Sequence, residues 1–255
     1  MLLVANLMRT LKLTIAYDGT RYAGWQVQNG STRKPTIQGV LEQTLQRILQ
    51  ERVSVVGSGR TDAGVHALAQ VAHVRTRSTI PRERLVRSLN QLLPSDIAVT
   101  KIEEAPATFH ARFGARMKCY RYRLFTGAVV PPFIRPYVHQ VRTPLHVSLM
   151  QREAALLRGR HDFKTFARVG DTSQATVRSI TDIRLVQKQE EMQIEVAGAG
   201  FLHTMVRSIV GTLIDVGRGH LPPGTIRRML RTGNRGLAGT TAPAKGLTLV
   251  HVVYR

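Results

Sequence analysis

The sequence predicts an α+β protein of two ferredoxin-like halves, each with the element order β-α-β-β-α-β, in a pseudo-symmetric arrangement with a basic cleft between them. Three observations carry this prediction. The chain has 255 residues, 43% of them hydrophobic, which is enough for a sizeable folded core. Strand-type and helix-type patterns alternate along it. The same order occurs twice, with a join near 105–116, although the repeat is one of pattern and not of residue identity.

The elements of the first half follow from two periodicities. Alternating apolar residues predict strands, and apolar residues three and four positions apart predict helices. The predicted elements are strands at 11–17, 53–56, 69–76 and 97–103, and helices at 36–49 and from about Pro81. The first helix shows its stripe at Ile37, Leu41 and Leu45, with Thr36 before the first turn as its start signal.

The second half shows the same two patterns. The predicted elements are strands at 119–126, 179–187, 192–198 and 246–254, and helices at 148–158, 201–216 and 222–232. Ser148 and Gln151 have the spacing of a capping box, which predicts a helix start at Ser148. Gly217 is the expected C-terminal cap of the long helix. We therefore predict an N-terminal domain at 1–110 and a C-terminal domain at 111–255.

The charge of the chain is its first functional clue. It has 37 Lys and Arg against 16 Asp and Glu, a net charge of +21, and 30 of the 37 are Arg. The guanidinium group suits phosphate binding and stacking on bases, so a nucleic acid is the favoured partner. The alternative is an Arg-rich proteome in which every protein is basic. Candidate contacts with an RNA backbone are Arg75/Arg77, Arg82/Arg84/Arg87, Arg112/Arg116/Lys118 and Arg227/Arg228/Arg231.

Cysteine usage and hydropathy limit the setting of the protein. Cys119 is the only cysteine, so an internal disulfide or a cysteine-based metal site is excluded. No apolar run approaches the ~20 residues of a membrane span. Residues 1–8 lack a basic leader, and Met8 is an alternative start. A cytoplasmic protein without membrane association is expected.

The most informative segment is the loop 57–67, with the sequence GSGRTDAGVHA. Three glycines in eight residues indicate a close backbone approach or positive φ angles. No Gly-Lys-Ser/Thr ends the loop, and the spacing of a dinucleotide fingerprint is missing. A hydrolase triad of Ser58, Asp62 and His66 and a metal site of Asp62, His66 and His73 both lack their usual signatures. Asp62 as a simple turn residue is the remaining alternative, and the pattern alone does not separate it from a catalytic aspartate.

This loop resembles the active-site motif of the TruA family of tRNA pseudouridine synthases. Further segments resemble that family in the same order along nearly the whole chain: 17–28 (YDGTRYAGWQVQ), 109–112 (FHAR), 118–122 (KCYRY), 159–163 (GRHDF), 200–207 (GFLHTMVR) and 242–247 (APAKGL). Departures are small: His203-Thr204 is unusual for the family, and residues 1–9 are an extension.

The resemblance implies a role for five residues. Asp62 would be the catalytic carboxylate, and Arg207 would pair with it across the cleft and keep it oriented and ionised. Arg60 would contact RNA and help to extrude the target nucleotide. Tyr120 would stack on the extruded uracil, and Leu247 would line its pocket. The alternatives are a solvated helix Arg207, a phosphate-binding Arg60 and core roles for the other two; Trp25 fits a core or an RNA-facing role equally.

The resemblance also implies the reaction. The family converts uridine to pseudouridine in tRNA, in the anticodon stem-loop at positions 38–40, without a metal or any other cofactor, and its members are homodimers. The rival interpretation is a tRNA-binding or folding factor without catalysis, which would share the fold and charge but have no use for Asp62.

Overall fold

The computed structural model describes residues 8–28, 34–168, 170 and 175–254. It separates into two compact units. The first comprises Met1–Ala115 with Val250–Arg255, and the second comprises Arg116–Leu249. This division lies a few residues after the boundary that we predicted at 110/111, and it returns the C-terminal residues to the first unit.

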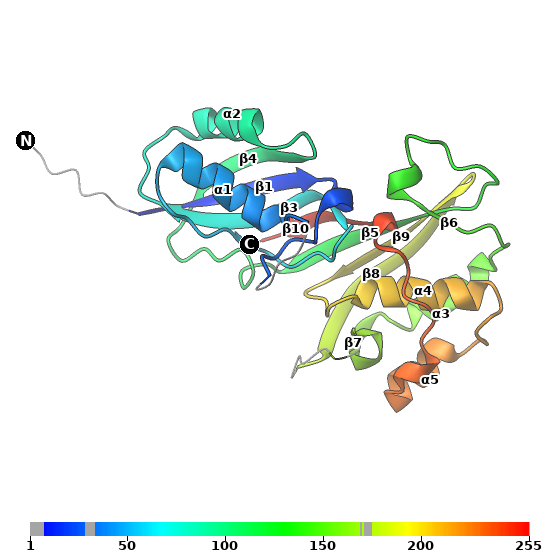
Figure 1. The fold of residues 1–255 in the computed structure, drawn as a ribbon. Coiled ribbons are helices and arrows are strands. Elements are labelled where there is room, and N and C mark those ends of the chain that lie inside the picture. Colours follow the sequence, from blue (N-terminus) through cyan, green and yellow to red (C-terminus); the bar gives the residue numbers. More distant parts are fainter. Residues whose placement is uncertain (1–7, 29–33, 169, 171–174, 255) are drawn as a thin grey trace, which may run out of the picture. The chain divides into compact units, whose positions relative to one another are not determined.

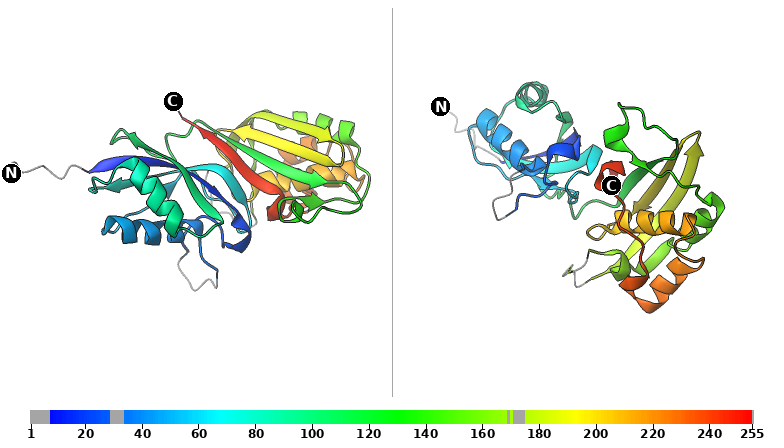
Figure 2. Two further views of the ribbon diagram at one scale, coloured as in Figure 1. Left: turned by 90° about the horizontal axis from the view of Figure 1, so that it is seen from above. Right: turned by 45° about the vertical axis from the view of Figure 1, so that its right-hand side comes forward.

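The first unit is an antiparallel sheet with two helices on one face (Figures 1 and 2). Its strands are β1 (Arg9–Tyr17), β2 (Val56–Gly57), β3 (His66–Thr76) and β4 (Ile97–Ala105), and its helices are α1 (Ile37–Leu49) and α2 (Arg82–Leu92). The strand order is β4-β1-β3, with β2 on the other side of β3. This is the order of a ferredoxin-like sheet, as the sequence predicts.

The sequence signals for these elements are largely confirmed. Thr36 caps α1, because its hydroxyl accepts the backbone N–H of Gly39 at 3.2 Å. Leu41 and Leu45 are fully buried, as their stripe predicts. The predicted strand 53–56 was wrong in extent, since only Val56 and Gly57 pair with β3. Strand β3 begins at His66, so the loop is shorter than predicted.

The second unit is also a sheet covered by helices (Figure 1). Its strands are β5 (Met117–Phe125), β6 (His139–Gln140), β7 (Gly159–Asp162), β8 (Val177–Lys188) and β9 (Glu191–Gly198), and its helices are α3 (Val147–Ala155), α4 (Met205–Gly217) and α5 (Thr225–Thr232). The strand order is β5-β9-β8-β7, and β6 is added in parallel to β5. The division between the units falls within β10 (Leu247–Val253).

Helix boundaries in this unit differ from the prediction by one to four residues, and the differences at α3 and α4 have a visible cause. Helix α3 starts at Val147, and Ser148 makes no cap because it is already inside the helix. Helix α4 starts at Met205 and not at 201, because Thr204 has a left-handed backbone with φ of +61°. Gly217 is the last residue of α4 and not its cap. Its lack of a side chain admits Met150, whose Sδ would lie 2.6 Å from a Cβ there.

Across the described ranges, none of the helices combines the length and the apolar character that crossing a lipid bilayer requires.

Candidate active site

The glycine-rich loop is reduced to residues 58–65, between the end of β2 and the start of β3. Its tip is a tight turn in which the backbone N–H of Val65 donates to the carbonyl of Asp62 at 3.1 Å. Gly64, the third residue of this turn, has a φ of +78°, which glycine adopts without strain. The turn presents the Asp62 side chain as a half-buried group and leaves Arg60 exposed. Asp62 is thus a turn residue, and its carboxylate is only partly removed from solvent.

A buried glutamine ties together the first arm of the loop. Gln70 is fully buried in β3; its Oε1 accepts the hydroxyl of Ser58 at 2.7 Å, and its Nε2 donates to the carbonyl of Gly59 at 3.0 Å. Ser58 is itself fully buried. A hydroxyl that is buried and donates to an amide is not placed as a nucleophile. The hydrolase triad is therefore not supported.

Thr61, directly before the tip of the loop, is held by residues of β1 and of the segment that follows it. The hydroxyl of Tyr17 lies 2.8 Å from Oγ1 of Thr61, and the N–H of Trp25 donates to the Thr61 carbonyl at 3.1 Å. Gly24 has a φ of +97°, and a Cβ there would lie 2.6 Å from the same carbonyl. Only glycine permits this approach. Thr61, the residue before Asp62, is therefore fixed through its side chain and its backbone.

Trp25 belongs to the core. Its side chain is 1% exposed, and the indole packs so closely on Gly57 that a Cβ there would lie 2.6 Å from the ring. Of the core role and the RNA-facing role that the sequence left open for Trp25, the structure supports the core role.

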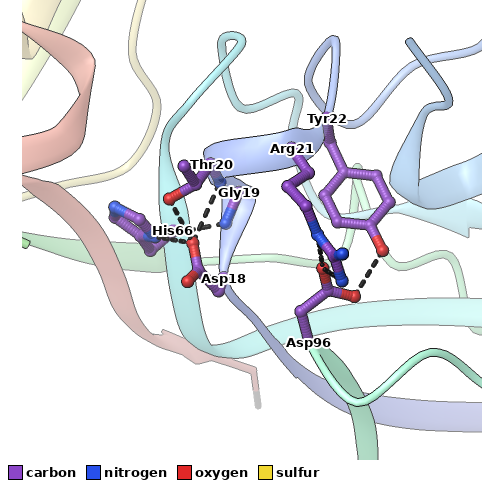
Figure 3. A network of polar contacts seen from close by, with 7 residues as sticks. All are labelled: Asp18, Gly19, Thr20, Arg21, Tyr22, His66 and Asp96. Carbon is purple, nitrogen blue, oxygen red and sulfur yellow. Dashed lines mark hydrogen bonds and ion pairs between the residues drawn. The ribbon is translucent and has the colours of Figure 1, made fainter. Parts of the chain in front are cut away.

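A polar network fixes the end of the loop (Figure 3). The backbone nitrogen of Gly19 lies 3.1 Å from Nδ1 of His66. That Nδ1 also lies 3.1 Å from Oδ1 of Asp18. These contacts exclude each other as hydrogen bonds, because Nδ1 accepts from Gly19 only when it carries no proton. Asp18 Oδ1 already accepts the N–H and the hydroxyl of Thr20, at 2.9 and 2.5 Å. A neutral His66 accepts the N–H of Gly19 and a protonated His66 pairs with Asp18, so either form ties the start of β3 to the segment after β1.

The same segment is anchored to the start of β4. Asp96 accepts the Nε and Nη2 of Arg21 at 2.8 and 2.6 Å and the hydroxyl of Tyr22 at 2.5 Å (Figure 3). Burial, together with the carboxylate of Asp96, raises the pKa of the Tyr22 hydroxyl. This hydroxyl therefore remains a donor at physiological pH, and the segment that supports the loop is held at both ends.

The alternative of a metal site at Asp62, His66 and His73 is not supported by the geometry. In the parts of the chain that the structure describes, no three His, Cys, Asp or Glu side chains are grouped as ligands of a metal ion. His73 Nδ1 accepts the backbone N–H of Ala111 at 3.2 Å.

A pocket of about 490 Å³ lies at the end of α1. None of the predicted site residues line it; its lining residues are Gln43, Gln46, Arg47, Gln50, Glu51 and Arg52.

The other three predicted site residues belong to the second unit. Arg207 lies in the first turn of α4, and its Nε donates to the carbonyl of Ala242 at 2.8 Å, which orients the guanidinium group. Tyr120 is 7% exposed on β5, and its ring meets that of Phe201 edge-on at 5.1 Å. Leu247, at the start of β10, is 5% exposed.

Sequence reasoning located the loop and missed its supports. Tyr17 and Gly24 lie in the segment 17–28 that resembles the family, but the sequence indicated no function for either. Gln70 lies outside all of these segments. The available signal for Gln70 was a polar residue within a buried strand, which requires a buried hydrogen-bond partner.

The family model described as tRNA pseudouridine synthase matches residues 13–114 and 154–255. The chain belongs to this family. It is 44% identical to tRNA pseudouridine synthase A of Ruminiclostridium cellulolyticum and 45% identical to that of Pelobacter propionicus, each over 97% of this chain and 100% of the relative. That of Acetivibrio thermocellus is 41% identical with the same coverage. The matches include the loop that carries Asp62.

Among solved structures, a chain of a Cbf5-Nop10-Gar1 complex is similar over 94% of this chain and 48% of its own length, with 12% identity and a TM-score of 0.40. A likeness this weak adds nothing to the assignment.

Proposed function

We propose that this enzyme isomerises uridine to pseudouridine in tRNA, with Asp62 as the catalytic carboxylate. Family membership supports the reaction, and the supports of the loop favour this residue. The segments before and after Asp62 are fixed by hydrogen bonds of Thr61 and Val65 and by close contact with Gly24. A carboxylate held in this way is positioned in advance for a substrate.

The reaction rearranges bonds within one nucleotide. The N1–C1′ bond breaks, the uracil turns, a C5–C1′ bond forms, the proton leaves C5, and N1 receives a proton. The carboxylate of Asp62 can serve as the nucleophile at C1′ or at C6, or as the base that removes a ribose proton. Each of these routes requires the ionised form, and none consumes another reactant.

Four further residues complete the proposal. Arg207 would orient the carboxylate of Asp62, since its guanidinium group is already directed by the carbonyl of Ala242. Arg60, exposed on the same loop, would bind the RNA backbone and help to extrude the target uridine. Tyr120 would stack on the extruded base and Leu247 would line its pocket.

The relatives' name and the resemblance of the motifs extend the proposal to its setting. We propose that the targets lie at positions 38–40 of the anticodon stem-loop, that the enzyme acts as a homodimer, and that it works in the cytoplasm. The net charge of +21 suits a polyanionic substrate of this size.

The proposal is tested by mapping pseudouridine in unmodified tRNA after incubation with the purified protein. Carbodiimide-dependent stops of reverse transcription should appear at positions 38–40 and vanish when these uridines are replaced by cytidines. A binding or folding factor would retain tRNA and produce no stop. That result would overturn the enzymatic assignment, whereas stops elsewhere would overturn only the positions.

A further inference from the structure

Phe113 is an exposed aromatic side chain on a segment that is otherwise rigidly held. It lies in the connection between β4 and β5, and 78% of it is exposed. The backbone N–H groups of Arg112 and Phe113 both donate to His110 Nδ1, at 3.1 and 3.2 Å, and the N–H of Gly114 donates to the His110 carbonyl at 2.8 Å. The histidine thus closes a compact turn that projects Phe113 outward.

Ring contacts continue from the exposed side chain into the core of the first unit. The ring of Phe113 lies on that of His110, with centroids 4.4 Å apart and planes at 34°. His110 in turn lies 4.9 Å from the ring of His73, which is 5% exposed in β3. The side chain that faces solvent therefore rests on a buried support and has little conformational freedom to lose on binding.

The base of the segment is fixed as well. The hydroxyl of Tyr254 donates to the carbonyl of Ala111 at 2.6 Å, and its ring lies 5.1 Å from that of Phe109. Arg75 donates to the carbonyl of Ala107 at 3.2 Å. A single exposed ring is common on protein surfaces, but a ring on a firmly anchored segment offers a preformed surface to a partner.

The charge around this ring identifies the partner's chemistry. The guanidinium group of Arg112 lies over the ring of Phe113 at 5.7 Å from its centroid. Residues 105–118 include three basic side chains and no acidic one. An aromatic ring beside cations is the arrangement that binds unpaired nucleotides, with the base on the ring and the phosphate at the cation.

We propose that Phe113 and Arg112 form a second RNA contact, at which an unpaired base of the tRNA stacks on Phe113 and a neighbouring phosphate binds Arg112. The contact rests on the proposed function for its substrate but takes no part in the isomerisation. It adds affinity without selecting a particular base, because stacking is tolerant of base identity.

The first test separates stacking from simple apolar contact. We would measure single-turnover isomerisation against protein concentration for Phe113→Leu and Phe113→Tyr, with Phe133→Leu as the control. Phe133 is 89% exposed and lies in the second unit. Phe113→Leu should raise the half-saturating concentration about tenfold at an unchanged maximal rate. Phe113→Tyr and the control should match the parent. Equal behaviour of the two leucine variants, or a loss confined to the maximal rate, would overturn the proposal.

The second test needs no turnover, and its outcome is therefore independent of the proposed function. Trp25, the single native tryptophan, is 1% exposed, so a tryptophan at 113 reports on the surface. The fluorescence of Phe113→Trp should be quenched by tRNA, including tRNA with cytidine at 38–40, and that of Phe133→Trp should not. Equal quenching in both variants, or none at 113, would overturn the contact. Quenching without isomerisation would overturn the proposed function alone.

Two further measurements examine the partner itself. Arg112→Gln should reduce the slope of log affinity against log salt by about 1, while Phe113→Leu should leave the slope unchanged. Sedimentation should give the same oligomeric state for Phe113→Leu and the parent. Dissociation of the variant would show that the ring contacts a second copy of the chain, which contradicts an RNA contact.

Discussion

The hydroxyl of Tyr17 lies 2.8 Å from Oγ1 of Thr61, the residue before Asp62. Burial raises the pKa of Tyr17 to about 12, so its hydroxyl is protonated at any physiological pH. A strand residue 44 positions earlier thus holds the loop next to the proposed catalytic carboxylate. Predictions about the loop follow from this contact and from the contacts that Gln70 and Gly24 make with neighbouring loop residues.

Tyr17→Phe should lower the maximal single-turnover rate more than it changes tRNA affinity, because it loosens the residue before Asp62 without touching the RNA. The buried hydroxyl of Thr61 would lose a partner, which costs about 1–2 kcal/mol of unfolding free energy. Thr61→Val is the matched change on the other side. In the double mutant the two losses should fall short of their sum by about 1 kcal/mol. Additive losses would show that the contact carries no energy.

Gln70→Leu should affect the first arm in the same manner. It removes the amide that accepts from Ser58 and donates to Gly59, and the loss of these two buried hydrogen bonds costs about 1–3 kcal/mol together. Denaturant unfolding would give the stability loss, and single-turnover kinetics the rate. The double variant Gln70→Leu/Ser58→Ala should recover part of the stability but not the rate. Full recovery of the rate would place Gln70 in a purely structural role.

Gly24→Ala should reduce activity more than its backbone cost alone explains. Both Gly24 and Gly219 have positive φ angles, +97° and +76°, so alanine costs about 1 kcal/mol at either position. Only at Gly24 would the new Cβ meet the Thr61 carbonyl, since nothing lies within 4 Å at Gly219. Gly219→Ala is therefore the control. Equal rates for the two variants would contradict a close approach at the loop.

The stability of the first unit should fall in mildly acidic solution through His73. Burial, with smaller contributions from His110 and Arg75, lowers the pKa of His73 from its ordinary value near 6.5. As the pH falls below about 6.5 the unfolded chain binds the proton first, so this stabilisation is complete above that pH and is lost below it. His73→Gln should flatten the dependence of unfolding free energy on pH between 5 and 7, and His220→Gln, at a side chain 66% exposed, should not. Parallel curves for all three proteins would contradict this assignment.

The sequence could predict local structure and the position of the loop. The stripe from Ile37 to Leu45 and the start signal at Thr36 are properties of neighbouring residues, and both are confirmed. Helix α4 was extended too far because periodicity does not reveal that Thr204 has a positive φ. The supports Tyr17 and Gln70 act at distances of 44 and 12 residues along the chain, where no local pattern reports a contact. The partnership of Asp62 with Arg207 and Tyr120 stays a prediction.

The most direct measurement is single-turnover release of tritium from C5-labelled tRNA by Asp62→Asn, with tRNA binding measured on the same preparation. Asparagine keeps the size of the side chain and removes its charge, so we predict that isomerisation is lost while binding is retained. Asp182→Asn, which alters a carboxylate paired with Arg158 in the second unit, should leave both unchanged. Substantial tritium release by Asp62→Asn would contradict the account.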